Sequence, residues 1–140
     1  MQEESFGIIP LKKKDNFWHV YLVRLKSGNH IGFPKGHKNR NETDIQAASR
    51  ELKEETNLSV KKFLSDKPLI EEYQLQKDKN IIHKIVYYYI AQVEGDFKID
   101  TNEVIEGFFV DLKKAKDLLT YENSKKTVLE VIEFLNKNFI

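Results

Sequence analysis

The stretch RELKEET, residues 50–56, holds three glutamates at a spacing that constrains how this part of the chain can fold. In a helix, side chains three and four positions apart are neighbours, so the carboxylates of Glu51, Glu54 and Glu55 would crowd one face. Like charges at this spacing destabilise a helix by about 0.2–0.5 kcal/mol per pair. A helix that keeps all three therefore needs another group that offsets their repulsion.

Other local signals also predict a helix here, from about residue 44 to residue 56. Thr43 and Gln46 have the spacing of a capping box, which satisfies backbone N–H groups at a helix start. Asn57 suits the helix end, because asparagine tolerates the left-handed backbone conformation. A periodicity of 3.6 predicts a narrow core-facing stripe made of Ile45, Ala48, Leu52 and Thr56.

The three glutamates fall beside this stripe rather than opposite it, where the helix edge meets the rest of the fold. At a separation of about 4 Å each pair would repel by roughly 1 kcal/mol in water and about 4 kcal/mol at an effective dielectric near 20. A divalent cation removes that repulsion, and carboxylate oxygens are ligands that Mg²⁺ or Mn²⁺ prefers. The alternative is a solvated helix whose glutamates pair with basic side chains, as Glu54 would with Arg50.

Strand-like and helical segments follow one another along the chain, with no repeat or linker between them. Helical periodicity predicts two further helices, at 112–119 and 122–138. Strands with a helix between them and helices at the end indicate an α/β fold, in which helices cover a sheet. Apolar, aromatic and β-branched runs predict strands at 5–11, 17–25, 31–33, 61–76 (one irregular strand), 81–93 and 107–110.

Composition excludes several classes of protein. A length of 140 residues predicts one domain, residues 1–140. The absence of cysteine excludes disulfides, zinc fingers and a thiol nucleophile, and favours a reducing cytoplasm. The net charge of +1 argues against general nucleic-acid binding, and no apolar run is long enough for a signal peptide or a membrane span. Nothing in the sequence predicts an oligomeric state.

A loop upstream of the helix completes a longer pattern. Gly36 allows a close backbone approach, and Glu42, next to the helix start, can accept hydrogen bonds from loop amides. From Gly36 to Leu58 the chain resembles the Nudix box, G-x5-E-x7-R-E-U-x-E-E-x-G-U, in which U is aliphatic. The one departure is Asn57 in place of glycine, and asparagine can adopt the same backbone conformation. The matching residues are Gly36, Glu42, Arg50, Glu51, Leu52, Glu54, Glu55 and Leu58.

The resemblance implies an α/β/α sandwich with a mixed β-sheet, and hydrolysis of a nucleoside diphosphate linked to another group. It also implies that Mg²⁺ or Mn²⁺ is bound by Glu51, Glu54 and Glu55. The backbone at Gly36, through the carbonyl just before it, would join them. Arg50 would orient a glutamate through a salt bridge, and water activated by the metal would attack a phosphate.

The general base comes from different places within this family, so more than one candidate stays open. Glu51 is one of them. Glu103, in a loop shortly before the last predicted strand, is the other, and Glu106 is a weaker third.

Two further segments indicate a substrate. FPKGH, residues 33–37, and HKIVYYYIA, residues 83–91, resemble stretches of the asymmetrical diadenosine tetraphosphate hydrolases, which cut that dinucleotide into ATP and AMP. This resemblance implies a dinucleoside polyphosphate substrate. Other Nudix activities, such as pyrophosphate removal from RNA 5′ ends or hydrolysis of a nucleoside triphosphate, would use the same box. A Nudix-fold module that senses a nucleotide without cleaving it is the third alternative.

Side chains outside the box would bind such a substrate. Lys35, His37 and Lys84 are the candidates for the phosphates furthest from the cations, because cationic side chains pair with phosphate oxygens. Adenine needs a flat stacking partner, and the candidates for that role are Tyr88 and Tyr121.

Overall fold

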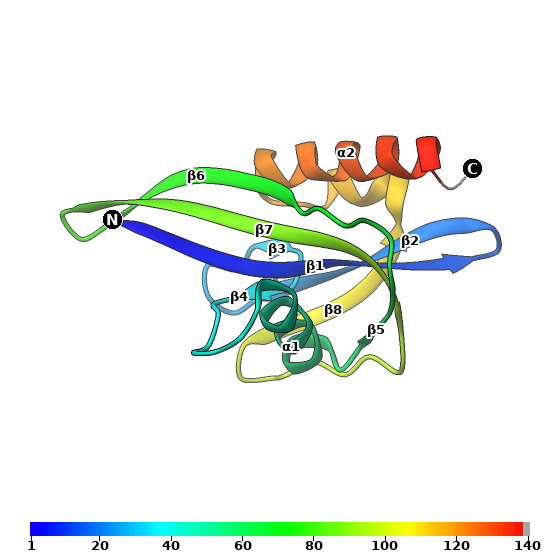
Figure 1. Ribbon diagram of the computed structural model, residues 1–140, viewed down its shortest axis with the longest axis horizontal. Coiled ribbons are helices and arrows are strands. Elements are labelled where there is room, and N and C mark those ends of the chain that lie inside the picture. The colour runs from blue at the N-terminus through cyan, green and yellow to red at the C-terminus, as the bar shows by residue number, and fades with distance from the viewer. Residues whose placement is uncertain (139–140) are drawn as a thin grey trace.

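The computed structural model describes residues 1–138, which form a mixed sheet with helices on both faces (Figure 1). The predicted α/β fold is confirmed. The helices are α1 (Asp44–Thr56), the 3-10 helix η1 (Leu112–Asp117) and α2 (Glu122–Asn138). The eight strands of the described chain are β1 (Gln2–Lys14), β2 (Phe17–Leu25), β3 (Ile31–Gly32), β4 (Lys35–Gly36), β5 (Ser59–Phe63), β6 (Leu69–Lys77), β7 (Asn80–Glu94) and β8 (Val104–Asp111).

β1 lies in the middle of the sheet and joins its two halves. A two-residue turn at Asp15 and Asn16, both with positive φ, returns the chain into β2, which pairs antiparallel with β1. On its other side β1 pairs in parallel with β7, where Ile8 lies opposite Tyr89. β3 and β8 both pair with β2, and β5 and β6 both pair with β7. The short β4 pairs with β1 near the start of the chain.

Successive residues of β1 point to opposite faces of the sheet and contribute to two separate cores. Ile8 belongs to the core that contains Leu52 of α1. Ile9 belongs to the core that contains Val128 of α2. Helix α1 therefore covers one face, and η1 with α2 covers the other, which gives three layers (Figure 1).

Helix α1 begins and ends where its capping signals predict. The Gln46 backbone N–H donates to the Thr43 hydroxyl at 3.2 Å, and the Thr43 N–H donates to the Gln46 side chain at 2.9 Å. Asn57 follows in the left-handed conformation, with φ of 66°. The predicted core stripe is wrong at Ile45, which is 41% exposed, because α1 is rotated so that it buries Glu55 instead.

The single strand predicted at 61–76 is wrong, because two strands, β5 and β6, occupy this segment. The chain between them leaves the sheet after Leu64, whose N–H still donates to the carbonyl of Ile90 in β7 at 2.9 Å. There the Ser65 hydroxyl donates to the carbonyl of Lys67 at 3.1 Å, and Pro68 has no N–H with which to continue a ladder. The turn lets β5 and β6 pair with different parts of the same strand, β7.

The remaining predicted elements are present, most of them with changed bounds. β2 and α2 have the predicted limits, whereas β1, β7 and β8 extend beyond theirs. The α-helix predicted at 112–119 is the shorter 3-10 helix η1, and the two-residue β4 was not predicted. None of the helices in residues 1–138 is long and apolar enough to cross a membrane.

Candidate active site

The three glutamates of α1 differ in their exposure to solvent. Glu55 is 4% exposed, and its Oε1 has no hydrogen-bond partner within the described chain. The side chain of Glu51 is 14% exposed and that of Glu54 is 55% exposed. This carboxylate face therefore runs from a buried group at Glu55 to a solvent-facing group at Glu54.

Arg50 connects the carboxylate face to the loop before α1. Its Nη1 donates to Glu51 at 3.0 Å and to Glu54 at 3.2 Å. Its Nε donates to Glu42 at 2.7 Å, and its Nη2 donates to the backbone carbonyl of His37 at 2.8 Å. Glu42 in turn accepts a hydrogen bond from a loop N–H at 2.7 Å. The Arg50 guanidinium thus fixes the positions of Glu51 and Glu54 relative to the loop before α1.

Gly36 lies directly against Glu51. A Cβ at this position would overlap the carboxylate group of Glu51. The backbone here is held by pairing between β4 and β1, and the backbone of the preceding residue, Lys35, hydrogen-bonds the Glu55 carboxylate. The main chain of residues 35–36 therefore lies against the carboxylate face. This close approach requires glycine at position 36, because any side chain there would overlap Glu51.

Burial and neighbouring charge shift the pKa values of these carboxyl groups. Burial raises the pKa of Glu55 to about 8, and the nearby Glu51 carboxylate adds to the rise. Burial also raises the pKa of Glu51, although the hydrogen bond from Arg50 opposes the rise. The same guanidinium lowers the pKa of Glu42 through a hydrogen bond. A cation beside Glu51 and Glu55 would offset the repulsion that disfavours their ionised forms.

The donors at this face fit a hard divalent cation. Glu51, Glu54 and Glu55 offer carboxylate oxygens, one of which is buried and unpartnered, and Gly36 lets the main chain come close. Within residues 1–138, no three acidic or histidine side chains are already gathered as a metal cluster, and two of these glutamates are bonded to Arg50. The face therefore holds the right ligand chemistry, with Arg50 as its present partner.

The two candidate bases near β8 have different surroundings. Glu103 lies in the turn before β8, close enough that its charge raises the pKa of Glu51 and of Glu55. Glu106 forms an ion pair with Arg24 at 3.0 Å across β8 and β2. The fold brings Glu103 toward the carboxylate face and gives Glu106 a separate partner.

A cavity of about 620 Å³ opens beside the carboxylate face, lined by β6, β7 and the start of α2. Four of the predicted substrate-binding residues, Lys35, Lys84, Tyr88 and Tyr121, line it. His37 does not, because its side chain is exposed elsewhere and only its carbonyl takes part, as an acceptor for Arg50. The fold thus assembles four of the predicted residues from three separate segments and leaves His37 out.

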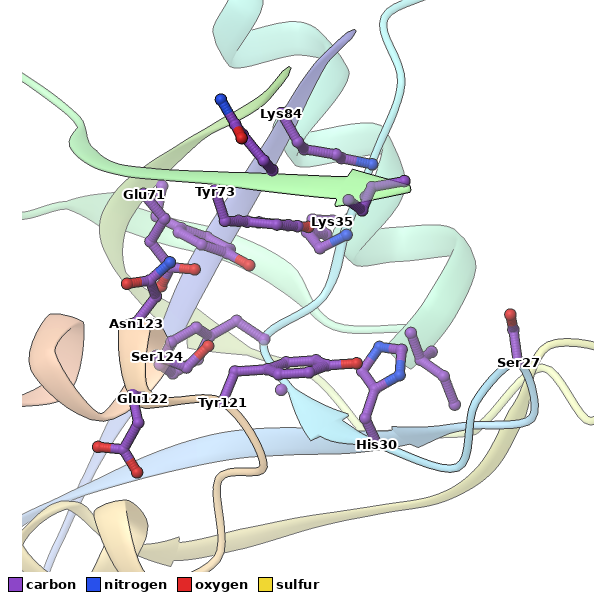
Figure 2. Close-up of a pocket in the computed structure, with 16 residues that line it drawn as sticks. Ser27, His30, Lys35, Glu71, Tyr73, Lys84, Tyr121, Glu122, Asn123 and Ser124 are labelled. Atoms are coloured by element: carbon purple, nitrogen blue, oxygen red, sulfur yellow. The ribbon is translucent and has the colours of Figure 1, made fainter. Parts of the chain in front are cut away.

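Lys35 and Lys84 make one side of this cavity cationic (Figure 2). Lys84 is only 9% exposed, and Lys35 is half-buried. Burial lowers the pKa of Lys35, and the charge of Lys84 lowers it further. An anion bound between the two ammonium groups would relieve their repulsion, which suits this side to phosphate.

The two predicted stacking tyrosines have opposite environments. Tyr88 is 2% exposed and packs edge-on against Phe33, with ring centroids 5.2 Å apart. Tyr121 is 55% exposed, and its ring contacts His30 at 5.3 Å between centroids. Tyr121 can therefore offer a ring face to a ligand, whereas Tyr88 belongs to the core beneath the cavity.

Several lining residues with polar or aromatic side chains were missed at the sequence level, among them His30, Glu71 and Tyr73. Glu71 and Tyr73 lie two positions apart on β6 and share one face of the sheet. The prediction of one irregular strand concealed this alternation. Pro68 was the available signal, because a break there sets the start of a regular strand and its period of two.

Glu71 gives the fold a pH dependence whose sign can be worked out. It is 6% exposed, and burial raises its pKa above 4.5, although hydrogen bonds from Thr127 and Ser124 oppose the rise. The folded chain keeps a proton here that the unfolded chain releases, so this carboxyl contributes most below pH 4.5 and the contribution is lost as pH rises. We expect urea denaturation between pH 4.5 and 7 to show a steeper fall in the free energy of unfolding for the wild type than for Glu71→Gln. Parallel curves would contradict the assignment.

The comparisons with known proteins agree with this geometry. A family model described as NUDIX domain matches residues 1–131. The chain belongs to the Nudix hydrolase family. This Nudix hydrolase is 29% identical over 129 residues to the asymmetrical bis(5′-nucleosyl)-tetraphosphatase of Rattus norvegicus, a match that covers 89% of the chain and 86% of the rat protein. The family predicted from the box is thereby confirmed.

Solved structures show the same fold in other Nudix proteins. A binary complex of the Ap4A hydrolase of C. elegans matches with a TM-score of 0.76 at 19% identity, over 96% of this chain and 98% of that one. The NUDIX domain of Shewanella oneidensis NrtR, complexed with ADP ribose, also matches with a TM-score of 0.76, at 14% identity over 96% of this chain and 89% of that one. At these identities the matches establish the fold, and the predicted α/β/α sandwich is confirmed.

Proposed function

We propose that this Nudix hydrolase cuts diadenosine tetraphosphate asymmetrically into ATP and AMP. The observation that carries the proposal is the cavity of about 620 Å³, which combines cationic and aromatic sides and adjoins the carboxylate face through the consecutive residues Lys35 and Gly36. The rat relative, named for this activity, supports the same substrate.

The cavity offers separate places for phosphate and base. Lys35 and Lys84 bind phosphate oxygens on the side next to the carboxylate face. Figure 2 shows the rings of Tyr73 and Tyr121 on opposite sides of the cavity. A base between these rings stacks on both, which is worth about 1–3 kcal/mol per base. The nucleotide then runs from the stacked base to the reacting phosphate beside α1.

The carboxylate face would hold the divalent cation, Mg²⁺ or Mn²⁺, through Glu51, Glu54, Glu55 and the backbone at Gly36. When bound, the cation supplies charge neutralisation on the phosphates and lowers the pKa of water. Arg50 keeps Glu51 and Glu54 in position through the bonds described above. The hydrolysis adds one water across a single P–O–P bond. The water oxygen bonds to the attacked phosphorus and gives one proton to a base, while the bond from that phosphorus to the bridging oxygen breaks and the bridging oxygen leaves with the other product.

Glu51 and Glu103 both remain candidates for that base. Glu51 borders the main chain at Gly36, and Glu103 approaches from the β8 side close enough to influence Glu51 and Glu55 electrostatically. A reducing cytoplasm stays our prediction for the location, since the chain has no cysteine.

The proposal is tested by chromatography of the products that purified protein and Mg²⁺ form from diadenosine tetraphosphate, beside ATP, ADP-ribose and a triphosphorylated RNA. Equal amounts of ATP and AMP support it. Two ADP, or pyrophosphate release from RNA with the dinucleotide intact, would overturn it in favour of another Nudix activity. Tight nucleotide binding without any turnover would identify a nucleotide-sensing module instead.

Tyr121→Ala should raise KM for diadenosine tetraphosphate by about tenfold, because it removes one stacking surface. Its melting temperature should match the wild type, since the ring is 55% exposed. Steady-state kinetics and a thermal melt check both statements. Leu118→Ala is the control. Leu118 is an exposed apolar residue three positions before Tyr121 and does not line the cavity, so this variant should leave KM unchanged. An unchanged KM in Tyr121→Ala would remove this tyrosine from the base site.

A further inference from the structure

One wall of the cavity carries hydrogen-bond acceptors. Glu71 and Asn123 both line this wall, and Figure 2 shows them together, opposite His30. Glu71 is 6% exposed, and its Oε2 accepts a hydrogen bond from the Thr127 hydroxyl at 2.6 Å. A buried carboxylate at the wall of a ligand cavity is a strong acceptor, because little water competes for it.

Asn123 adds a second acceptor beside the carboxylate. Its Nδ2 donates to the backbone carbonyl of Glu72 at 3.1 Å. One N–H of the amide is thereby engaged with the main chain of β6, which leaves the carbonyl oxygen as an acceptor for a ligand beside the second N–H. The wall made by Glu71 and Asn123 therefore calls for a ligand edge that donates.

The order of groups along the cavity sets which part of a nucleotide meets this wall. Lys35 and Lys84 lie on the side next to the carboxylate face, and Tyr73 and Tyr121 lie on either side of the cavity (Figure 2). Glu71 lies on the adjoining wall, close enough to Lys35 for their charges to interact. A nucleotide with its phosphate at the lysines and its base between the tyrosines points the outer edge of the base at Glu71. That edge carries the exocyclic group of a purine.

We propose that Glu71, supported by Asn123, accepts a hydrogen bond from the exocyclic amino group of the base and makes the cavity selective for adenine over hypoxanthine; this rests on the proposed function. The 6-amino group of adenine donates two N–H bonds. Hypoxanthine carries an oxygen at the same position, which would face the two acceptors without a hydrogen bond, and its one donor on this edge, N1–H, lies at the neighbouring ring position. The preference is thus built by attraction to one base and repulsion of the other.

Glu71 also has a structural role that the test must separate. Its bond to Thr127 and the bond from Asn123 to β6 hold the first two turns of α2 against the sheet. Glu71→Gln keeps an oxygen that can accept from Thr127, but its amide can also donate to a base oxygen. Thr127→Val removes the hydroxyl of the contact and leaves the carboxylate in the cavity.

The test is calorimetric binding of AMP and of IMP to the wild type, Glu71→Gln and Thr127→Val. We expect the wild type to bind AMP tighter than IMP on the order of tenfold. In Glu71→Gln the two affinities should come within about twofold, whereas Thr127→Val should keep the wild-type ratio. Equal affinities in the wild type, an unchanged ratio in Glu71→Gln, or the same loss of ratio in Thr127→Val would each overturn the inference.

Hydrolysis separates failure of this inference from failure of the proposed function. Turnover of both diadenosine and diinosine tetraphosphate at equal kcat/KM overturns base selection and leaves the hydrolase activity in place. If neither dinucleotide is hydrolysed but AMP still binds more tightly than IMP, the proposed function is overturned and the role of Glu71 in base selection is supported.

Discussion

Glu54→Gln is expected to lower kcat for diadenosine tetraphosphate on the order of a hundredfold, while the fold is kept. The substitution removes one negative charge from the carboxylate face and keeps the size of the side chain. The side chain is 55% exposed, and the bond it loses is an ion pair to Arg50 at 3.2 Å. Exposed pairs of this kind contribute about 0–1 kcal/mol, so the free energy of unfolding should change little.

A matched control exists on the other helix. Glu133 of α2 is 67% exposed and pairs with Lys137 at 3.0 Å, with the same spacing of four residues that joins Arg50 and Glu54. Glu133→Gln makes the same chemical change away from the carboxylate face and should leave kcat at the wild-type value. Steady-state kinetics in Mg²⁺ and a urea melt of both variants decide the matter. Equal rates for Glu54→Gln and wild type would show that α1 is not the catalytic helix.

Gly36→Ala is expected to reduce activity about a hundredfold through displacement of Glu51, since misplacement of a catalytic group by about 1 Å costs roughly that factor. Gly36 does not have a left-handed backbone, so alanine can adopt its conformation. The atoms that the new Cβ would overlap are those of the Glu51 carboxylate, the far end of a flexible side chain. That side chain can turn away, so the folded state should survive while the carboxylate face is disturbed.

A double-mutant cycle tests this route from Gly36 to Glu51. If the glycine acts only by leaving space for the carboxylate, Gly36→Ala/Glu51→Ala will be no less active than Glu51→Ala alone. Additive losses would show that the main chain at Gly36 has a separate role. A fall of the melting temperature in Gly36→Ala that accounts for the lost activity would contradict the prediction outright.

The parts of the fold that could be predicted are those encoded by near neighbours in the chain. Helix α1 has the predicted limits because its capping box joins Thr43 and Gln46 and its end depends on Asn57 alone. The β1–β2 turn likewise needs only the two residues at its tip. The break before β6 was not predicted, because apolar residues on both sides of Pro68 continue the pattern of a strand.

The candidate site was predictable where a motif holds its residues at fixed spacing, and less so where the fold brings them together. Glu51, Glu54 and Glu55 share one helix, so their proximity follows from the sequence. Glu71 meets Thr127 across 56 positions, and no local pattern marks either residue. The buried face of α1 was misread for a related reason: apolar periodicity favoured Ile45, whereas the helix buries Glu55.

The parallel pairing of β1 with β7 has a consequence for how the chain is made. Residues 2–11 pair with residues 83–92, and α1 packs on a core that includes Tyr89, Ala91 and Val93 of β7. On a ribosome that adds roughly 5–20 residues per second, α1 therefore waits about two to eight seconds after its own synthesis before the β7 side of its core exists. During those seconds α1 can dock only on β1 and β2, and the apolar side chains that β7 later covers stay open to aggregation.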